Sequence, residues 1–309
     1  MVIEQISGRW IPADTAAVAA ALAEAGLTVD PGELTLLKRD DRFTCTMPGD
    51  HMVWFPQNEA GLARLTREAR VLRLLREHCD FRVPEVEYEA KAGWQVRRVV
   101  PGRADPLAVA QRASSDRVLA TTIGSAIGTN LALQHAIPAA HLVGWLPTTP
   151  TWPPTRAEIE RDLGRVVDDR RLKAQALMTI ERYEDEIAHR THRVLVHCDL
   201  GFHNMVIDHA GRVAGIFDYD DAAFADRHLD FRYLLLDRDE ETLLQAAIGA
   251  YGRKGGLAID VGLVRLLNAA AAVGFLAFRA GYGPSEKPAG RTLDEDLRWT
   301  RMALERAGS

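Results

Sequence analysis

The sequence is poor in cysteine, with only Cys45, Cys79 and Cys198 in 309 residues. These three are far apart and odd in number, and no C-x-x-C pair occurs. The pattern argues against a disulfide framework and against a cysteine-based zinc site. It fits a reducing compartment, and we expect a cytoplasmic protein.

The sequence also lacks an excess of positive charge, because its net charge is −5. A nucleic-acid partner is therefore not expected, since such binding needs a basic face. The first residues, MVIEQISGRWIPAD, have neither the basic nor the apolar region of a secretion signal. The apolar run Leu266–Ala277 is too short to span a bilayer, which predicts a buried helix and no membrane association.

Internal repeats and low-complexity tracts are absent as well. The composition, 47% hydrophobic and 26% charged, is ordinary for a globular protein. A chain of 309 residues is large for one compact core. We therefore expect one bilobal unit or two domains.

The first hundred residues carry a mixed pattern of helix and strand signals. Asp14 precedes an alanine-rich helix that ends at Gly26. Short strand-like runs follow at 33–38, 42–47, 51–55, 83–86 and 94–100, with an amphipathic helix predicted over 60–78. The segment PGRADP, residues 101–106, then breaks the pattern, and most of the later chain has helical periodicity. The expected division is a first lobe over 1–100 and a helical second lobe over 101–309.

The most informative stretch is Val194–Asp230, VLVHCDLGFHNMVIDHAGRVAGIFDYDDAAFADRHLD. Two apolar runs, 205–207 and 213–217, flank Asp208-His209-Ala210-Gly211, which predicts a hairpin with a positive φ at Gly211. If the runs pair, Asp199, Asn204 and Asp218 converge at one end of a small sheet. Two carboxylates and an amide oxygen suit Mg²⁺, which takes a few protein oxygens together with phosphate oxygens and water.

The same stretch resembles a known family. His-x-Asp, an Asn five residues after that Asp, and an apolar strand closing on another Asp form the catalytic-loop and metal-Asp arrangement of protein kinases. The forms HCDLGFHN and IFDYDDAAFADRHLDFRYL are most similar to the aminoglycoside phosphotransferase and choline kinase-like branch. The resemblance implies an α+β, bilobal protein kinase-like fold, with an antiparallel N-lobe sheet plus a helix and a mostly helical C-lobe. It also implies ATP or GTP as co-substrate and Mg²⁺ as cofactor.

The resemblance assigns roles within this stretch. Asp199 would orient the attacking hydroxyl and take its proton. Asn204 and Asp218 would bind Mg²⁺. His197 would brace the loop by hydrogen bonds, and Asp230 would fix the loop without touching substrate.

In the N-lobe the match is incomplete. Glu68 stands at the place of the family's helix glutamate, but Trp54 stands where a strand Lys or Arg would hold the α- and β-phosphates. The family's Gly-containing loop between the first two strands is missing too. Arg39 or Arg42 could supply charge to the phosphates instead, or these side chains are simply exposed turn residues. Val100, at the expected hinge, would face the adenine through main-chain groups.

The acceptor is not defined by the sequence. Asp221 and Trp145 are candidates for the wall of its pocket, although Trp145 could equally pack its loop onto the core. The leading hypothesis is a small-molecule O-kinase that acts on an aminoglycoside-like antibiotic or a related hydroxylated, often cationic metabolite, as a monomer or homodimer. The alternative is a nucleotide-binding pseudokinase without transfer activity, because the strand Lys is missing. A metal hydrolase using His197, Asp199 and His203 is weaker, because the two histidines are six apart and bracket a turn.

Overall fold

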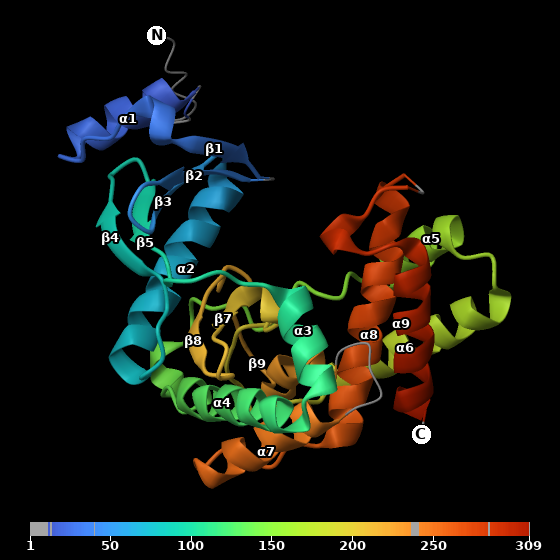
Figure 1. The fold of residues 1–309 in the computed structure, drawn as a ribbon. Helices are drawn as coiled ribbons and strands as arrows, with labels where there is room; N and C mark the ends of the chain where they lie inside the picture. The colour runs from blue at the N-terminus through green and yellow to red at the C-terminus, as the bar shows by residue number, and fades with distance from the viewer. Residues whose placement is uncertain (1–11, 13, 40, 236–240, 284, 309) are drawn as a thin grey trace. The chain divides into compact units, whose positions relative to one another are not determined.

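The computed structural model describes residues 12, 14–39, 41–235, 241–283 and 285–308. The chain forms two compact units (Figure 1). The first contains the described residues up to Asp105 together with 202–209 and 213–221, and the second contains the remaining ones. The first segment of this unit ends at Asp105, within residues 101–106, where the sequence predicted the division.

A five-stranded antiparallel sheet forms the centre of the first unit. In spatial order its strands are β1 (Thr35–Lys38), β2 (Arg42–Met47), β3 (His51–Pro56), β5 (Gln95–Arg98) and β4 (Glu85–Glu89). The predicted runs all contain strands, but the run expected at 83–86 begins its strand only at Glu85. Pro84 has no N–H to donate to a ladder, which accounts for the later start.

Two helices cover opposite faces of this sheet. Helix α1 (Thr15–Glu24) begins at Asp14, whose side chain accepts a hydrogen bond from the Ala17 N–H at 2.8 Å. Its residues Val18 and Leu22 pack into an apolar core with alternate residues of β2, β3 and β5. Helix α2 (Glu59–His78), capped by Asn58, contacts the other face. The predicted N-lobe of sheet and helix is confirmed.

Both strands of the predicted hairpin belong to this first unit, whereas residues 210–212 of its turn are assigned to the second. Strands β7 (Met205–Ile207) and β8 (Val213–Ile216) pair antiparallel, and Gly211 has φ +81° as expected. The hairpin backbone lies against the strand that leads to the hinge: a Cβ on Gly215 would be 2.5 Å from Val100 Cγ1 and 2.8 Å from the Arg82 carbonyl oxygen. The compact units therefore differ from the predicted lobes, which placed this hairpin with the residues after 100.

The second unit is mostly helical. Its helices are α3 (Pro106–Ser115), α4 (Arg117–His135), α5 (Arg156–Val166), α6 (Arg170–Ala188), α7 (Thr242–Arg253), α8 (Val261–Phe278) and α9 (Leu293–Gly308). Short 3₁₀ helices also occur in the described residues: η1 (Pro31–Glu33), η2 (Ala139–His141), η3 (Phe202–Asn204), η4 (Arg227–Leu235), η5 (Arg279–Gly281) and η6 (Pro288–Gly290), of which η1 and η3 belong to the first unit. Helix α3 was not predicted, because Pro106 was interpreted as a break although proline is also common at the first position of a helix.

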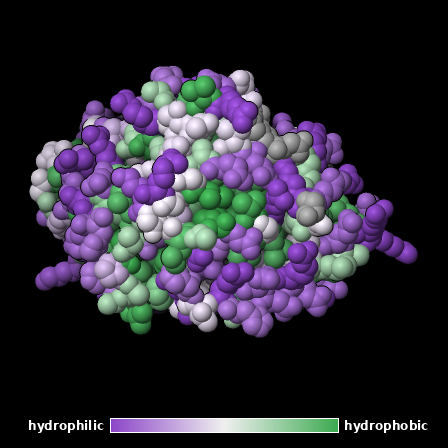
Figure 2. All heavy atoms as spheres, turned by 90° about the horizontal axis from the view of Figure 1, so that it is seen from below, coloured by the Kyte–Doolittle hydropathy of each residue, from purple (hydrophilic) through white to green (hydrophobic). Residues whose placement is uncertain are grey.

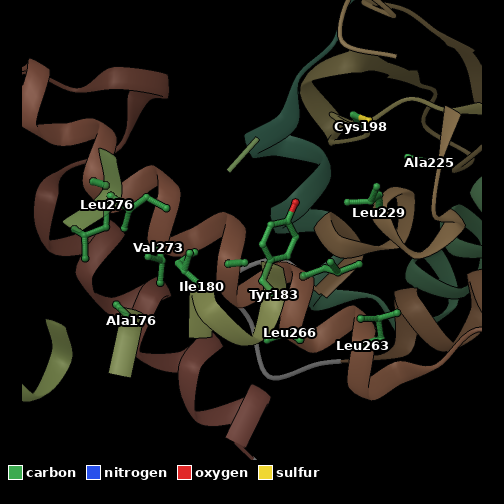
Figure 3. Close-up of a cluster of buried hydrophobic side chains, with 14 of the residues drawn as sticks. Ala176, Ile180, Tyr183, Cys198, Ala225, Leu229, Leu263, Leu266, Val273 and Leu276 are labelled. Carbon is green, nitrogen blue, oxygen red and sulfur yellow. The ribbon is translucent and has the colours of Figure 1, made fainter. Parts of the chain in front are cut away.

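A small sheet inside this unit positions the polar loop that follows it. Strand β6 (Val194–Val196) pairs antiparallel with β9 (Ala223–Ala225), a strand that the sequence did not predict. Both strands join α6 and α8 in one apolar core (Figure 3). Figure 3 shows Ile180 and Tyr183 of α6 beside residues of α8. The backbone at the end of β6 is thus attached to a rigid base.

Helix α8 is longer than the predicted run at 266–277. Together with the turn after it, Val261–Gly281 is long and apolar enough to cross a membrane by length and composition, so the prediction based on length was wrong. The flanking residues Leu263 and Val264 extend the run. However, 72% of the apolar window is buried inside the protein, which agrees with the predicted buried helix.

The face seen in Figure 2 is mostly hydrophilic, with a hydrophobic area near its centre and smaller ones towards its edges. Exposed large apolar side chains of the described residues are Leu37, Leu107, Val118, Val143, Met178, Leu257, Phe278 and Tyr282.

Candidate active site

The carboxylate of Asp230 holds the backbone just before Asp199. It is fully buried, and its two oxygens accept the His197 N–H at 2.9 and 3.0 Å. One of them also accepts the Cys198 N–H at 3.0 Å. Asp230 therefore binds the two consecutive backbone N–H groups that precede Asp199.

Cys198 adopts an unusual backbone conformation at this point. Its φ is +70°, in the left-handed region that residues other than glycine rarely occupy. Its N–H is bound by Asp230, and its carbonyl accepts a hydrogen bond from the buried guanidinium of Arg232. Left-handed strain of this kind persists only where surrounding contacts over-determine it, and it concentrates at functional sites. The turn into Asp199 is therefore imposed by Asp230 and Arg232 together.

A second set of contacts orients Asp230 from behind. Gln134 Nε2 donates to it at 2.8 Å, and His135 Nε2 lies 3.1 Å away. His135 Nδ1 in turn lies 3.0 Å from the hydroxyl of Tyr251, and burial raises the pKa of Tyr251 to about 12. Burial alone would raise the pKa of Asp230, but the hydrogen bond and charge of His135 and the nearby His197 hold it below its usual value. Asp230 is therefore a charged anchor inside the protein.

Asp199 itself is half-buried and belongs to the second unit. Its N–H donates to Nδ1 of the buried His197 at 3.3 Å, which leaves the ring proton of a neutral His197 on Nε2. The Asp199 carbonyl accepts the Gly201 N–H at 2.9 Å. This hydrogen bond links the ring of His197 to the backbone at Asp199, and the predicted bracing role stays a prediction.

Asn204 and Asp218 lie at one end of the β7–β8 hairpin. Met205 pairs with Ile216, and the Phe217 N–H donates to the Asn204 carbonyl at 3.0 Å, directly before Asp218. Asn204 is buried, whereas Asp218 is exposed with φ +66°. The predicted pairing of the two runs is confirmed. The convergence of Asp199 with these two residues stays a prediction, because Asp199 is in the other unit.

An arginine cluster surrounds Asp220, two residues after Asp218. Arg42 Nη2 lies 2.5 Å and Arg64 Nη1 3.3 Å from the same carboxylate oxygen, and Arg67 Nη2 donates to the Asp220 carbonyl at 2.9 Å. Burial alone would lower the pKa of Arg42, but Asp220, with smaller contributions from Glu68 and Asp218, raises it. Arg42 Nη1 and Arg67 Nε are buried without a hydrogen-bond partner within the described part of the chain.

Glu68 has a partner that the sequence analysis missed. Arg97 Nη1 on β5 lies 2.5 Å from the Glu68 carboxylate, and the side chains are only 1% and 4% exposed. Trp54, at the expected lysine position, lies with its ring centroid 4.7 Å from the Arg97 guanidinium carbon. The ion pair that we expected from the third strand is thus made from the neighbouring strand. The alternation in WQVRRVV contained the signal, because Gln95 and Arg97 are polar residues on one face of a buried strand.

The other predicted residues occupy varied settings. Arg39 is exposed, and its N–H donates to the Arg42 carbonyl at 2.8 Å. Val100 is buried against the hairpin. Asp221 is half-buried, and so is Trp145, whose Nε1 donates to the His141 carbonyl at 2.7 Å.

The donors on the hairpin suit a hard cation better than zinc. Within the described ranges, no group of three or more His, Cys, Asp or Glu side chains could hold a metal. An Asn and an Asp are too few for a zinc cage, but Mg²⁺ binds through one or two protein carboxylates plus substrate phosphates and water. The residues therefore fit a metal that arrives with a phosphorylated ligand.

Comparison with solved structures identifies the fold. The chain is similar to the GDP complex of wild-type aminoglycoside 2'-phosphotransferase-IIIa, with TM-score 0.66, 17% identity, and 96% and 98% of the two chains covered. It is also similar to the streptomycin–ATP–APH(2″)-IIa ternary complex, with TM-score 0.62, 16% identity, and 96% and 97% of the two chains covered. A third similar structure is macrolide 2'-phosphotransferase MphH from Brachybacterium faecium, with TM-score 0.61, 20% identity, and 93% and 97% of the two chains covered. The predicted kinase-like fold is confirmed.

Sequence comparison gives the family. No curated protein matches the chain. The model of the phosphotransferase enzyme family APH matches residues 52–262, from β3 to the start of α8. This match covers more than half of the chain and includes the loop after β6, the hairpin and the Asp230 anchor. The chain belongs to the phosphotransferase enzyme family.

Proposed function

We propose that this protein transfers the γ-phosphoryl group of ATP or GTP, with Mg²⁺, to a hydroxyl group of a small molecule. The observation that carries the proposal is the Asp230 anchor, which forces the backbone before Asp199 into one geometry. Phosphoryl transfer needs alignment and charge neutralisation more than covalent help from the protein. A carboxylate carried on a backbone that is held in this way supplies such alignment.

Each residue has one role in this proposal. The Asp199 carboxylate orients the acceptor hydroxyl and accepts its proton as the bond to phosphorus forms. Asn204, through its amide oxygen, and Asp218 hold Mg²⁺, which neutralises charge on the phosphates. Val100 at the hinge offers main-chain groups to the base of the nucleotide.

The acceptor class is an aminoglycoside, a macrolide or a related hydroxylated metabolite. The similar proteins of solved structure are named for aminoglycosides and macrolides, and one complex holds streptomycin with ATP. We place Asp221 and Trp145 at the acceptor, where an acid would suit an amine and an indole would suit a sugar face. We expect the enzyme to act in the cytoplasm.

A screen with labelled nucleotide tests the proposal. The purified protein is incubated with γ-labelled ATP or GTP and Mg²⁺ against panels of aminoglycosides, macrolides, choline-like amines and sugars. We expect a labelled acceptor that requires Mg²⁺. Nucleotide binding without any labelled product from these panels would favour the alternative, a nucleotide-binding protein without transfer activity.

A further inference from the structure

Two arginines of the first unit lie near Glu68, and they differ in what they leave available to a ligand. This inference rests on the proposed function, because it concerns how the nucleotide phosphates are held without the strand lysine. Arg42 and Arg97 are both candidates for the replacement. Strand register places them on the same face of the sheet: Arg42 is opposite Pro56, Trp54 is opposite Gln95, and Arg97 is opposite Met52.

Arg97 is fully engaged inside the protein. Its Nη1 binds Glu68, and its Nε and Nη2 donate to Gln95 Oε1 at 3.1 and 2.7 Å. The Trp54 ring lies against its guanidinium. All three guanidinium nitrogens of Arg97 therefore have protein partners, which leaves none of them without an acceptor. Its position instead ties β5 to α2 through the Glu68 carboxylate.

Arg42 is engaged on one side only. Its Nη2 is bound by Asp220, whereas its Nη1 is buried and has no hydrogen-bond partner among the residues described. Arg67 is bound to the same residue through Nη2, and its Nε is likewise buried without a hydrogen-bond partner among the residues described. Buried donors without acceptors are unfavourable, and a ligand that carries several oxygens would satisfy them.

The charges around Arg42 fit a phosphate that is accompanied by a cation. Glu68 is neutralised by Arg97, and Asp220 by Arg42 and Arg64. The remaining acid that acts on Arg42 is Asp218, which is the proposed metal ligand. Nucleotide phosphates enter kinase-like sites together with such a metal. Repulsion by Asp218 would therefore not oppose a phosphate at Arg42.

We propose that two arginines divide the work of the missing lysine: Arg97 pairs with Glu68 and braces the sheet against α2, while Arg42 contacts a nucleotide phosphate through Nη1. One arginine can bind a carboxylate and a phosphate at the same time, because its guanidinium carries five N–H donors in a fork. In Arg42 one branch of the fork is held by Asp220 and the other is left for the phosphate. Asp220 is the positioning residue for this cation.

Calorimetric binding of ADP and adenosine, and of GDP and guanosine, with Mg²⁺ tests the proposal. Arg42→Gln should weaken binding of the better diphosphate about ten- to a hundredfold, the range for one hydrogen bond to a charged group. Binding of the nucleoside should stay within about threefold, since it has no phosphate. The matched control is Arg64→Gln, which removes a second arginine from the same carboxylate and should leave diphosphate affinity within about threefold.

The other half of the proposal is tested by Glu68→Met/Arg97→Met. Removing both partners leaves no unpaired buried charge, so this double variant should fold and should keep diphosphate affinity within about threefold. If Arg42→Gln does not fold, Arg42→Lys keeps the charge beside Asp220 but lacks the second nitrogen, and it should show the same selective loss of the diphosphate. Unchanged diphosphate binding in the Arg42 variant, or a selective diphosphate loss in the double variant, would overturn the division of roles.

Because the readout is binding, the outcome is separable from that of phosphate transfer. A wild-type protein that transfers phosphate, but whose diphosphate affinity does not depend on Arg42, disproves this inference alone. If the wild-type protein transfers no phosphate, but Arg42→Gln selectively weakens diphosphate binding, only the proposed function is disproved. A wild-type protein that binds diphosphate no better than nucleoside contradicts both.

Discussion

Replacing Asp230 with asparagine changes the anchor behind Asp199 while keeping its shape. One carboxylate oxygen accepts the His197 and Cys198 N–H groups, and the other faces the side chains of Gln134 and His135. An asparagine has one acceptor oxygen and one NH₂ group that only donates. On one of these two sides, the NH₂ group must therefore face groups that donate as well. The loss is therefore about two hydrogen bonds to a charged group.

Hydrogen bonds to charged groups contribute about 1.5–3 kcal/mol each. We therefore expect Asp230→Asn to lower the free energy of unfolding by about 3–6 kcal/mol at pH 7, a large part of the roughly 5–15 kcal/mol of a typical domain. Urea unfolding followed by circular dichroism measures this change. Asp185→Asn, an exposed acid on α6, is the control and should change the stability by less than about 0.5 kcal/mol.

The pH dependence of this difference has a defined sign. The pKa of Asp230 is lower in the folded protein than in the unfolded chain, where it is about 3.9. The stabilisation from its charge is therefore present above about pH 4 and is lost as the pH falls through the folded pKa. The difference in free energy of unfolding between wild type and Asp230→Asn should be constant near neutrality and should decrease below about pH 4. A decrease in the free energy of unfolding of less than about 1 kcal/mol at pH 7 would show that Asp230 does not hold this backbone.

Three further predictions concern other parts of the molecule. Gly215→Ala should cost about 1–3 kcal/mol in urea unfolding, because its Cβ would overlap the Arg82 carbonyl, and wild-type stability would contradict the close packing of the hairpin. Asp218→Asn should raise the Mg²⁺ concentration needed for half-maximal transfer, and an unchanged Mg²⁺ titration would remove it as a metal ligand. Burial, with a smaller contribution from Asp80, raises the pKa of Cys79 to about 12, so its thiol should react with a disulfide reagent at pH 8 only after unfolding. Rapid reaction of Cys79 in the native protein would contradict this environment.

Local patterns in the sequence predicted the elements that carry the chemistry. The turn at 208–211 and the apolar runs beside it gave the hairpin, and Gly211 has the positive φ that the turn required. The helix over 60–78 was predicted because its apolar periodicity is regular, and Glu68 on it was singled out by the resemblance. These features depend on neighbours in the sequence, which is why they could be seen without a structure.

Contacts between distant residues were not predictable in the same way. Arg97 reaches Glu68 from 29 residues away, and Arg232 reaches Cys198 from 34 residues away. The alternation in WQVRRVV places Gln95 and Arg97 on one face of the strand. A charged residue in a strand is ordinarily expected on the exposed face, so the structure was needed to show that this face is buried against Glu68. From the sequence, Trp54 was a departure from the family pattern. In the structure, its ring lies against Arg97 of β5, which pairs with Glu68.

The role of Asp199 as general base is tested by comparing phosphate transfer by wild type and Asp199→Ala. With the acceptor found in the screen, the rate constant for transfer should fall about 10²- to 10⁴-fold, the usual contribution of a general base. Nucleotide affinity and the unfolding midpoint should stay close to wild type, and Asp208→Asn in the hairpin turn should transfer at the wild-type rate. Transfer at a normal rate by Asp199→Ala would show that Asp199 is not the catalytic base.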